Sequence, residues 1–391
     1  MPEAVIVDVV RTPSGRGKPG GVLSAVHPVD LAAGVLAALL ERSGLESRQV
    51  DDVLMGCVSQ TGDQSLNIAR QAVLAAGFDE TVPAVTIDRQ CGSSQQAAHF
   101  AAQGVIAGAY DIVIAAGVES MSRVPLGSSA HGGSVSRGVA HRYPEGLVNQ
   151  GVSAELIAQR WGFAREELDA FAAESHRRAT DAWNRGAFDA QVVPVLAGGD
   201  AVAFDETVRA GTTAASLAAL NPAFRTDALA ARFPDLDWRI TAGNSSPLTD
   251  AASAALIMSE AKAAELGLTP RARFHSFAVV GDDPMMMLTG PIPATRRILE
   301  RSGLTIDDLD VYEVNEAFAS VPLAWQRDLD ADSEKLNPWG GAIALGHAVG
   351  ASGTRLLGTL VSYLEATGGR YGLQTMCEGG GMANATIIER I

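Results

Sequence analysis

The chain has 391 residues, of which 47% are apolar and 19% are charged, a composition typical of a globular protein with more than one domain. Its 45 acidic and 30 basic residues give a formal net charge of -15, which argues against nucleic acid or an anionic membrane surface as the main partner. Three widely separated cysteines, Cys57, Cys91 and Cys377, indicate neither a disulfide framework nor a zinc site.

The predicted location of the protein is the cytoplasm. The first residues lead directly into an apolar, β-branched run at 4–10, without a basic segment or a cleavage site. The apolar run at 31–40 is too short to span a bilayer. Unpaired cysteines fit a reducing compartment.

The first part of the chain predicts alternating strands and helices. In order, these are a strand at 4–10, a glycine-rich loop at 11–17, a helix at 30–42 that ends at Gly44, a strand at 50–56, a strand at 84–87, a helix at 97–106 and a strand at 111–117. This order is typical of an α/β protein.

Cys91 lies in the turn between the strand at 84–87 and the helix that follows. Unpaired backbone N–H groups and the positive end of the helix dipole meet there. A dipole effect of at most about 2 kcal/mol would lower the pKa of the thiol by roughly 1.5, and a reactive thiolate also needs a base. A small buried cysteine with no catalytic role fits the same pattern. The role of Cys91 therefore depends on what the second half of the chain supplies.

An internal repeat links the two ends of the chain. The sequence Leu-Glu-Arg-Ser-Gly-Leu occurs at 40–45 and again at 299–304, an offset of 259 residues (from 40 to 299), and an acidic turn and a strand follow each copy. The same offset takes Cys91 to position 350, just after His347, which is predicted to open a helix. A pseudo-twofold axis between the halves would bring Cys91 and His347 face to face.

The middle of the chain interrupts the alternation of strands and helices. A serine- and glycine-rich loop is expected at 121–141, and a helix at 165–185 carries an outward Glu174/Arg178 pair. The βαβ order resumes at Ser246-Pro247, which predicts an N-cap and the first residue of a helix. The expected domains are a first half (1–120 plus 246–271), an inserted cover domain (121–245) and a second half (272–391).

Four features of the second half are candidates for serving Cys91. His347 has glycines on both sides, and Cys377 precedes three glycines between predicted strands at 373–376 and 385–388. Asn315 follows a strand, where an N-cap is the default interpretation. The methionines at 285–287 are either core filler or an adaptable apolar wall for a ligand.

These motifs resemble the thiolase family. They are Asp-Arg-Gln-Cys-Gly-Ser at 88–93, Asn-Glu-Ala-Phe at 315–318, Gly-Gly-Ala-Ile-Ala-Leu-Gly-His at 340–347 and Cys-x-Gly-Gly-Gly-Met at 377–382, in this order over the full length. The resemblance implies duplicated βαβ halves in a layered α-β-α-β-α arrangement, with a cover domain that binds coenzyme A. It also implies an acyltransferase that interconverts acyl-CoA plus acetyl-CoA with 3-ketoacyl-CoA plus CoA through an acyl-cysteine.

The resemblance also implies residue roles. Cys91 would be the nucleophile that His347 activates, and Cys377 would move the proton at the α-carbon of acetyl-CoA. Asn315 would hold a water that completes one oxyanion site with His347, and the N–H groups of Cys91 and Gly379 would form the second. Two sites fit the chemistry, because thioester exchange and the carbon–carbon step develop charge on two different oxygens.

Coenzyme A thioesters are the implied substrates, with no permanently bound cofactor and no metal. Arg209, Ser216 and Phe224 would meet the nucleotide and pantetheine, and Ser246, Met287, Ala317 and Phe318 would line the pantetheine tunnel. A solvated surface charge explains Arg209 equally well. The resemblance further implies a homo-oligomer, either a dimer or a tetramer.

Several positions depart from the usual family pattern. Ala348 stands in place of proline, Ser94 in place of glycine, and Glu378 in place of an apolar or small residue, where an inward carboxylate would raise the thiol pKa. Asn-Gln-Gly at 149–151 replaces the His-Met-Gly of short-chain members. This last change favours degradative cleavage of longer or bulkier 3-ketoacyl-CoA, including sterol-type acids.

Three alternatives remain open at this point. One is a short-chain acetoacetyl-CoA thiolase (acetyl-CoA acetyltransferase). Another is a condensing enzyme of the ketoacyl synthase type, which uses a cysteine and a histidine but does not need Cys377. The last is a non-catalytic paralogue that binds acyl-CoA.

Overall fold

The computed structural model describes residues 2–391, in which ten strands form one sheet. These strands are β1 (Ala4–Arg11), β2 (Gly15–Arg16), β3 (Asp52–Gly56), β4 (Ala84–Ile87), β5 (Ile112–Ser120), β8 (Thr249–Ser259), β9 (Ala272–Gly281), β10 (Val311–Val314), β11 (Tyr371–Glu378) and β12 (Met382–Arg390). A separate hairpin pairs β6 (Val195–Ala197) with β7 (Asp200–Val202).

The helices surround and separate the two halves of this sheet. They are α1 (Pro28–Ser43), α2 (Ile68–Ala75), α3 (Ser93–Ile106), α4 (Arg137–Arg142), α5 (Gln150–Trp161), α6 (Arg165–Asn184), α7 (Ala214–Ala218), α8 (Asp227–Arg232), α9 (Glu260–Leu266), α10 (Pro291–Ser302), α11 (Ser320–Leu329), α12 (Ala342–Leu345) and α13 (Ser352–Thr367).

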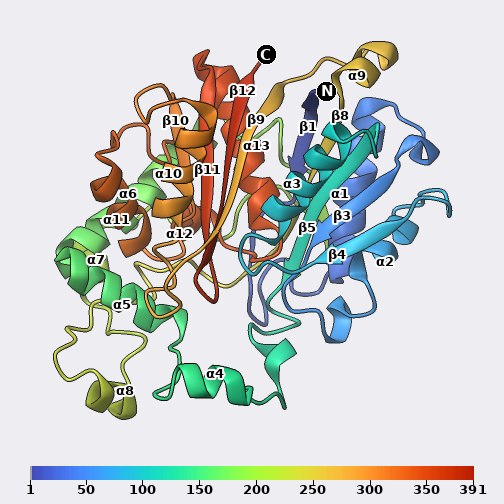
Figure 1. Cartoon of the computed structure of the whole chain (residues 1–391). Coiled ribbons are helices and arrows are strands. Elements are labelled where there is room, and N and C mark those ends of the chain that lie inside the picture. The colour runs from blue at the N-terminus through green and yellow to red at the C-terminus, as the bar shows by residue number, and fades with distance from the viewer. Residues whose placement is uncertain (1) are drawn as a thin grey trace.

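The strand order is β10-β11-β12-β9-β1-β8-β5-β3-β4, with β2 beside β8. The first half of the chain supplies β1, β2, β8, β5, β3 and β4, and the second half supplies β9, β10, β11 and β12. The two half-sheets join only where β1 meets β9, through the pairs Val5–Arg273 and Ile6–Ala272. Figure 1 shows the half-sheets side by side, with α3 and α13 between them.

Five layers result, as the family resemblance implies. Helices α1 and α2 pack on the outer face of the first half-sheet, and α10 packs on that of the second. The middle layer can be thin because the buried face of α3 consists largely of alanine: Ala97, Ala98, Ala101 and Ala102. A Cβ at Gly353 of α13 would overlap Gln95 of α3, so this crossing requires glycine.

The duplication predicted from the repeated hexapeptide is confirmed by whole elements. Four pairs of boundaries differ by the same 259 residues: Ser43 and Ser302 end α1 and α10, Asp52 and Val311 begin β3 and β10, Ser93 and Ser352 begin α3 and α13, and Ile112 and Tyr371 begin β5 and β11. The glycines that end α1 and α10 both adopt the left-handed conformation, with φ of 68° and 73°.

Two local predictions are wrong. Ser246 and Pro247 do not begin a helix but lead into β8, which starts at Thr249 and is buried along its length. Proline lacks an N–H, so it fits the entry to a strand as well as the first turn of a helix. The segment 121–141 is not entirely loop either, because α4 begins within it at Arg137, with Ser136 as its N-cap.

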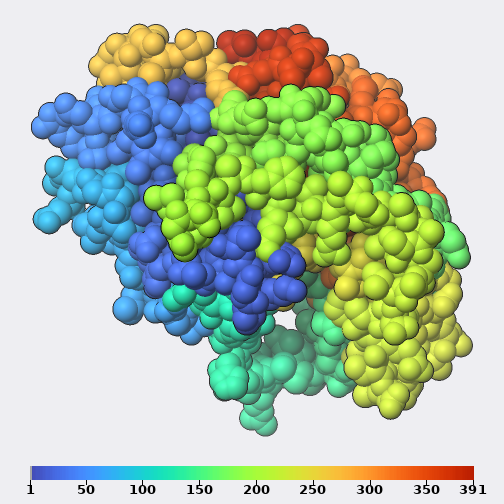
Figure 2. Space-filling view, turned by 180° about the vertical axis from the view of Figure 1, so that it is seen from behind, coloured from blue at the N-terminus to red at the C-terminus, as the bar shows by residue number. Residues whose placement is uncertain are grey.

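The segment between β5 and β8 contains α4 to α8 and the β6–β7 hairpin, and it is fastened to the first half of the chain. Arg11 and Asp205 form a buried ion pair at 2.7 Å, and the indole N–H of Trp183 also donates to Asp205. The N–H of Val193 donates to the carbonyl of Arg11. Figure 2 shows this segment lying across both halves. In the described part of the chain, no helix is long and apolar enough to cross a membrane.

Candidate active site

Cys91 occupies the turn between β4 and α3, as predicted, and it is buried. The preceding Gln90 has a φ of 48°, an uncommon conformation for a residue other than glycine. The side-chain amide of Gln150 lies 3.9 Å from the Cys91 sulfur, and the backbone N–H groups of Cys91 and Gly379 act to lower the pKa of this thiol. Gly379 follows Cys377 by two residues, so opposite ends of the chain meet here.

Burial, and not the helix terminus, dominates the acidity of both thiols. Burial raises the pKa of Cys91 to about 12, against the opposing hydrogen bond from Gln150. The predicted lowering of this pKa is therefore wrong, because desolvation of the thiolate outweighs the dipole. Burial also raises the pKa of Cys377, and a charge on Cys91 raises it further. Gly379, two residues after Cys377, lies against the side chain of Gln90, the residue before Cys91.

His347 does not open a helix, contrary to the prediction. It lies in a turn between α12 and α13, after Gly346 with a φ of 86°, and its N–H donates to Thr249 Oγ1 at 2.9 Å. The hydroxyl of Ser352 donates to the carbonyl of Ala348 at 2.9 Å, so its oxygen accepts from His347 Nδ1–H at 2.6 Å. The lone pair of the imidazole is therefore on Nε2.

This imidazole is neutral at physiological pH. Burial, aided by the charge on Arg355, lowers the pKa of His347 to about 3. Asn315 Nδ2 lies 3.4 Å from His347 Nε2. Asn315 is not an N-cap, because α11 begins only at Ser320, and its Oδ1 is buried without a protein partner among residues 2–391. A neutral base, whose Nε2 lone pair faces the side-chain amide of Asn315, thus lies at this site.

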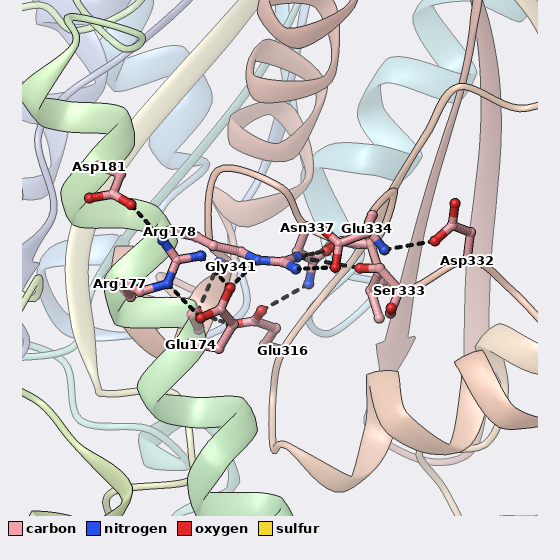
Figure 3. A network of polar contacts seen from close by, with 12 residues as sticks. Glu174, Arg177, Arg178, Asp181, Glu316, Asp332, Ser333, Glu334, Asn337 and Gly341 are labelled. Atoms are coloured by element: carbon pink, nitrogen blue, oxygen red, sulfur yellow. Dashed lines mark hydrogen bonds and ion pairs between the residues drawn. The ribbon is translucent and has the colours of Figure 1, made fainter.

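A buried carboxylate holds these parts together, and the sequence patterns did not single it out. Glu316 accepts hydrogen bonds from Ser175 Oγ at 2.6 Å, Asn337 Nδ2 at 2.9 Å and the N–H of Ile343 at 3.1 Å. Figure 3 shows Glu316 between α6 and the loop that precedes His347. Its network therefore fixes Asn315, its neighbour in sequence, relative to the histidine loop. Ser352 was missed in the same way, since a serine in the first turn of a helix is unremarkable by sequence.

Replacing Glu316 with alanine is expected to lower the free energy of unfolding by about 3–5 kcal/mol, because three buried donors lose their acceptor. Equilibrium denaturation followed by tryptophan fluorescence measures the change. Glu174→Gln is the matched control, since Glu174 pairs with Arg177 and Arg178 at the partly exposed edge of α6 in Figure 3. Such pairs contribute about 0.2–1 kcal/mol each. Equal stability of Glu316→Ala and the wild type would contradict the role of the network.

A pocket of about 730 Å³ opens onto this site. Of the seven predicted coenzyme A contacts, five line it: Phe224, Ser246, Met287, Ala317 and Phe318. Arg209 and Ser216 do not line it, and both are exposed. Ser216 lies in α7, whose Leu217 packs in the same apolar cluster as Phe318. The assignment of Arg209 and Ser216 to the nucleotide stays a prediction.

The rest of the pocket is lined by apolar side chains and by the side-chain amides of Gln90, Asn149 and Gln150. Its other lining residues are Gln90, Met121, Leu126, Val148, Asn149, Gln150, Gly151, Ser245, Pro247, Leu248, His347, Val349, Gly379 and Gly380. Met121 and Val349 belong to the same small apolar cluster as Cys91. Leu126 and Leu248 are 53% and 50% exposed, which is unusual for leucines that line a pocket. Among residues 2–391, no group of His, Cys, Asp or Glu side chains is placed to hold a metal ion.

Known proteins match this chain along its whole length. A model of the N-terminal domain of thiolase matches residues 4–261, and one of the C-terminal domain matches residues 268–390. A steroid 3-ketoacyl-CoA thiolase, FadA6 of Mycobacterium tuberculosis, is 45% identical, over 100% of this chain and 95% of that protein. A 3-ketoacyl-CoA thiolase of Cronobacter sakazakii is 44% identical, with both chains fully covered.

A solved structure agrees with these matches. The crystal structure of the Bacillus anthracis acetyl-CoA acetyltransferase superposes with a TM-score of 0.88 at 39% identity, and the match covers 100% of this chain and 99% of that one. The order of motifs and the duplicated halves agree with the two domain models. This chain therefore belongs to the thiolase family of acyltransferases.

Proposed function

We propose that this protein cleaves longer or bulkier 3-ketoacyl-CoA to acetyl-CoA and a shortened acyl-CoA. The observation that carries the chemistry is one shared pocket: it is lined by Gln90, which precedes Cys91, by Gly379, which follows Cys377 by two residues, and by the neutral His347. The Cys91 thiol is protonated at neutral pH, and His347 presents a lone pair to receive its proton. A simple hydrolase would need only one of the two thiols.

The first half of the reaction follows from these positions. The Cys91 thiol gives its proton to His347 Nε2 as the sulfur attacks C3 of the substrate. The C2–C3 bond then breaks, and its electron pair remains on C2 as the enolate of acetyl-CoA. The Cys377 thiol protonates C2, so acetyl-CoA leaves and the acyl group stays on Cys91.

The second half restores the enzyme. The thiol of coenzyme A gives its proton to the Cys377 thiolate and attacks the acyl carbonyl, and Cys91 leaves and recovers its proton from His347. Two sets of donors stabilise the charges that develop: the N–H groups of Cys91 and Gly379 on one oxygen, and protonated His347 with an Asn315-bound water on the other. Both N–H groups act to lower the pKa of the Cys91 thiol, against the effect of burial.

The remaining assignments concern the cover domain and assembly. We propose that residues 121–245 form a cover that binds coenzyme A, with Phe224 near the mouth of the pocket that this segment lines. Homo-oligomer formation and a cytoplasmic location stay predictions.

Three observations support a bulky acyl group. The pocket has an apolar wall next to Cys91, and its rim carries the exposed Leu126 and Leu248. Asn149 and Gln150 line it where short-chain members have His-Met. The relative from Mycobacterium tuberculosis is named for a steroid substrate.

The proposed substrate preference can be measured as a ratio of kcat/KM values for two substrates. The kcat/KM for a long-chain or sterol-type 3-ketoacyl-CoA is expected to exceed that for acetoacetyl-CoA by at least about tenfold, since each methylene bound in an apolar pocket contributes about 1–3 kcal/mol. Leu248→Asp should lower kcat/KM for the bulky substrate more than for acetoacetyl-CoA, because it places a charge on the rim. A preference of the wild type for the four-carbon substrate would instead identify an acetoacetyl-CoA thiolase.

A further inference from the structure

The repeat places two buried glutamates at equivalent positions. Glu119 lies near the end of β5 and Glu378 ends β11, and they are 259 residues apart (from 119 to 378). Both are fully buried. Each points towards the opposite half: Glu119 towards the loop before α13, and Glu378 towards the turn before α3. Comparing the residues around Glu119 with those around Glu378 therefore shows how the two halves treat an equivalent carboxyl group.

In the first half, the carboxylate is fully satisfied. Glu119 accepts from the N–H groups of Val58, Ser59 and Gly350 at 2.9, 3.0 and 3.0 Å, and from Gln64 Nε2 at 2.7 Å. Burial raises the pKa of Glu119, and these four donors oppose the shift. The ring of donors is typical of a structural carboxylate that ties two loops together.

In the second half, the equivalent carboxyl group lacks such donors. Neither oxygen of Glu378 has a hydrogen-bond partner among the described residues. The group lies against Gly92, where a Cβ would overlap it. Gly92 is the N-cap of α3 and directly follows Cys91, so Glu378 lies beside the nucleophile.

The missing donors can be traced through the repeat. The offset of 259 takes Gln64 to Leu323, which cannot donate, and takes Gly350 back to Cys91. The Cys91 N–H does not serve the carboxyl group, because neither oxygen of Glu378 accepts a hydrogen bond from any residue in 2–391. Glu119 accepts a hydrogen bond from the Gly350 N–H, but Glu378 accepts none from the equivalent Cys91 N–H. The Cys91 N–H therefore stays available for the thioester oxygen.

We propose that Glu378 is a positioning residue of the thiolase reaction, held as a neutral carboxylic acid so that it neither competes for the Cys91 N–H nor repels the charge that develops on Cys91 and the bound oxygen. A carboxylate at this place would do both. The inference rests on the proposed acyl transfer through Cys91 but not on the proposed acyl group.

The electrostatics agree with this geometry. Burial raises the pKa of Glu378 to about 8, with Arg89 opposing the shift and Asp88 adding to it. The other titratable groups that it faces are Cys91 and Cys377, and a negative charge on Glu378 raises the pKa of both. Glu378 is therefore neutral below about pH 8 and charged above it, so the reactivity of Cys91 is full below that pH and declines above it.

The test is the ratio of activity at pH 9 to that at pH 7 in each protein. For a group with a pKa of 8, the neutral fraction falls about tenfold between these two pH values, and kcat/KM of the wild type for 3-ketoacyl-CoA should fall accordingly. Glu378→Gln cannot ionise and should lose less than about twofold. Glu378→Ile, which carries the apolar type of side chain usual in the family, should behave likewise if the glutamine variant folds poorly. An equal alkaline loss in all three proteins, or none in the wild type, would overturn the proposal.

A control variant and a second readout separate this inference from the proposed function. Glu119→Gln should lower stability, because two of its acceptor positions become a donor group, but should keep the alkaline loss of the wild type. Alkylation of Cys91 by iodoacetamide, localised by intact mass and peptide mapping, needs no substrate. Its rate at pH 9 relative to pH 7 should be higher in Glu378→Gln than in the wild type. If that holds while no 3-ketoacyl-CoA is cleaved, only the proposed function fails; if cleavage occurs and the ratios are equal, only this inference fails.

Discussion

Replacing Cys91 with serine is expected to lower kcat for thiolysis by about 10⁴-fold or more. The serine hydroxyl is a much weaker nucleophile than a thiol, and removing the nucleophile of a covalent mechanism typically costs this much. Intact mass spectrometry after mixing with acyl-CoA should show an acyl adduct on the wild type and none on Cys91→Ser. Steady-state cleavage of 3-ketoacyl-CoA gives the rate.

Cys57 supplies the matched control for this experiment. It is equally buried, and burial raises its pKa strongly, but it lies in the apolar cluster under α1 and not in the cluster that holds Cys91 with the pocket residues Met121 and Val349. Cys57→Ser should keep kcat within about tenfold of the wild type, because the hydroxyl changes core packing and not the site. An acyl adduct that persists in Cys91→Ser would contradict the role of Cys91 as the acyl carrier.

Replacing Cys377 with alanine is expected to lower the rate of carbon–carbon cleavage by about 10²–10⁴-fold, the usual contribution of a positioned acid or base. The expected loss is selective. Cys91 should still accept an acetyl group from acetyl-CoA, because transfer between thioesters forms no enolate. Mass spectrometry of the acetylated protein and cleavage of 3-ketoacyl-CoA measure the two steps separately.

The same variant decides between two classes of enzyme. A condensing enzyme of the ketoacyl synthase type makes its enolate by decarboxylation and would tolerate loss of this thiol. Near wild-type turnover by Cys377→Ala, together with decarboxylation of malonyl-CoA, would therefore replace the thiolase mechanism by that of a synthase. Cys377→Ser is the conservative control, and its poorer acid should give an intermediate rate.

Much of the architecture could be predicted from local patterns. The alternation of strands and helices, the glycine that ends α1 and the repeated hexapeptide at 299–304 all depend on neighbouring residues, and they led to the duplicated halves that the structure shows. The turn that carries Cys91 was found for the same reason: a buried strand followed directly by a helical pattern leaves few alternatives.

The failures concern interactions between segments far apart in sequence. Asn315 has the residue type and place of an N-cap, but its side chain is directed to His347 from the other side of a loop. The helix predicted at His347 begins five residues later because Gly346 turns the chain and Thr249 of β8 binds the histidine N–H. The raised pKa of Cys91 depends on burial by several elements, which no local pattern contains.

The ion pair between Arg11 and Asp205 has a consequence for how ligands reach the thiols. Swinging the 121–245 segment outward as a rigid flap would separate a buried guanidinium from its carboxylate, a rupture that costs about 3–5 kcal/mol. The segment therefore stays in place almost all the time, and Leu126 and Leu248 line the way into the pocket. Access of acyl chains is expected to depend on the width and the apolar character of this entrance more than on movement of the segment.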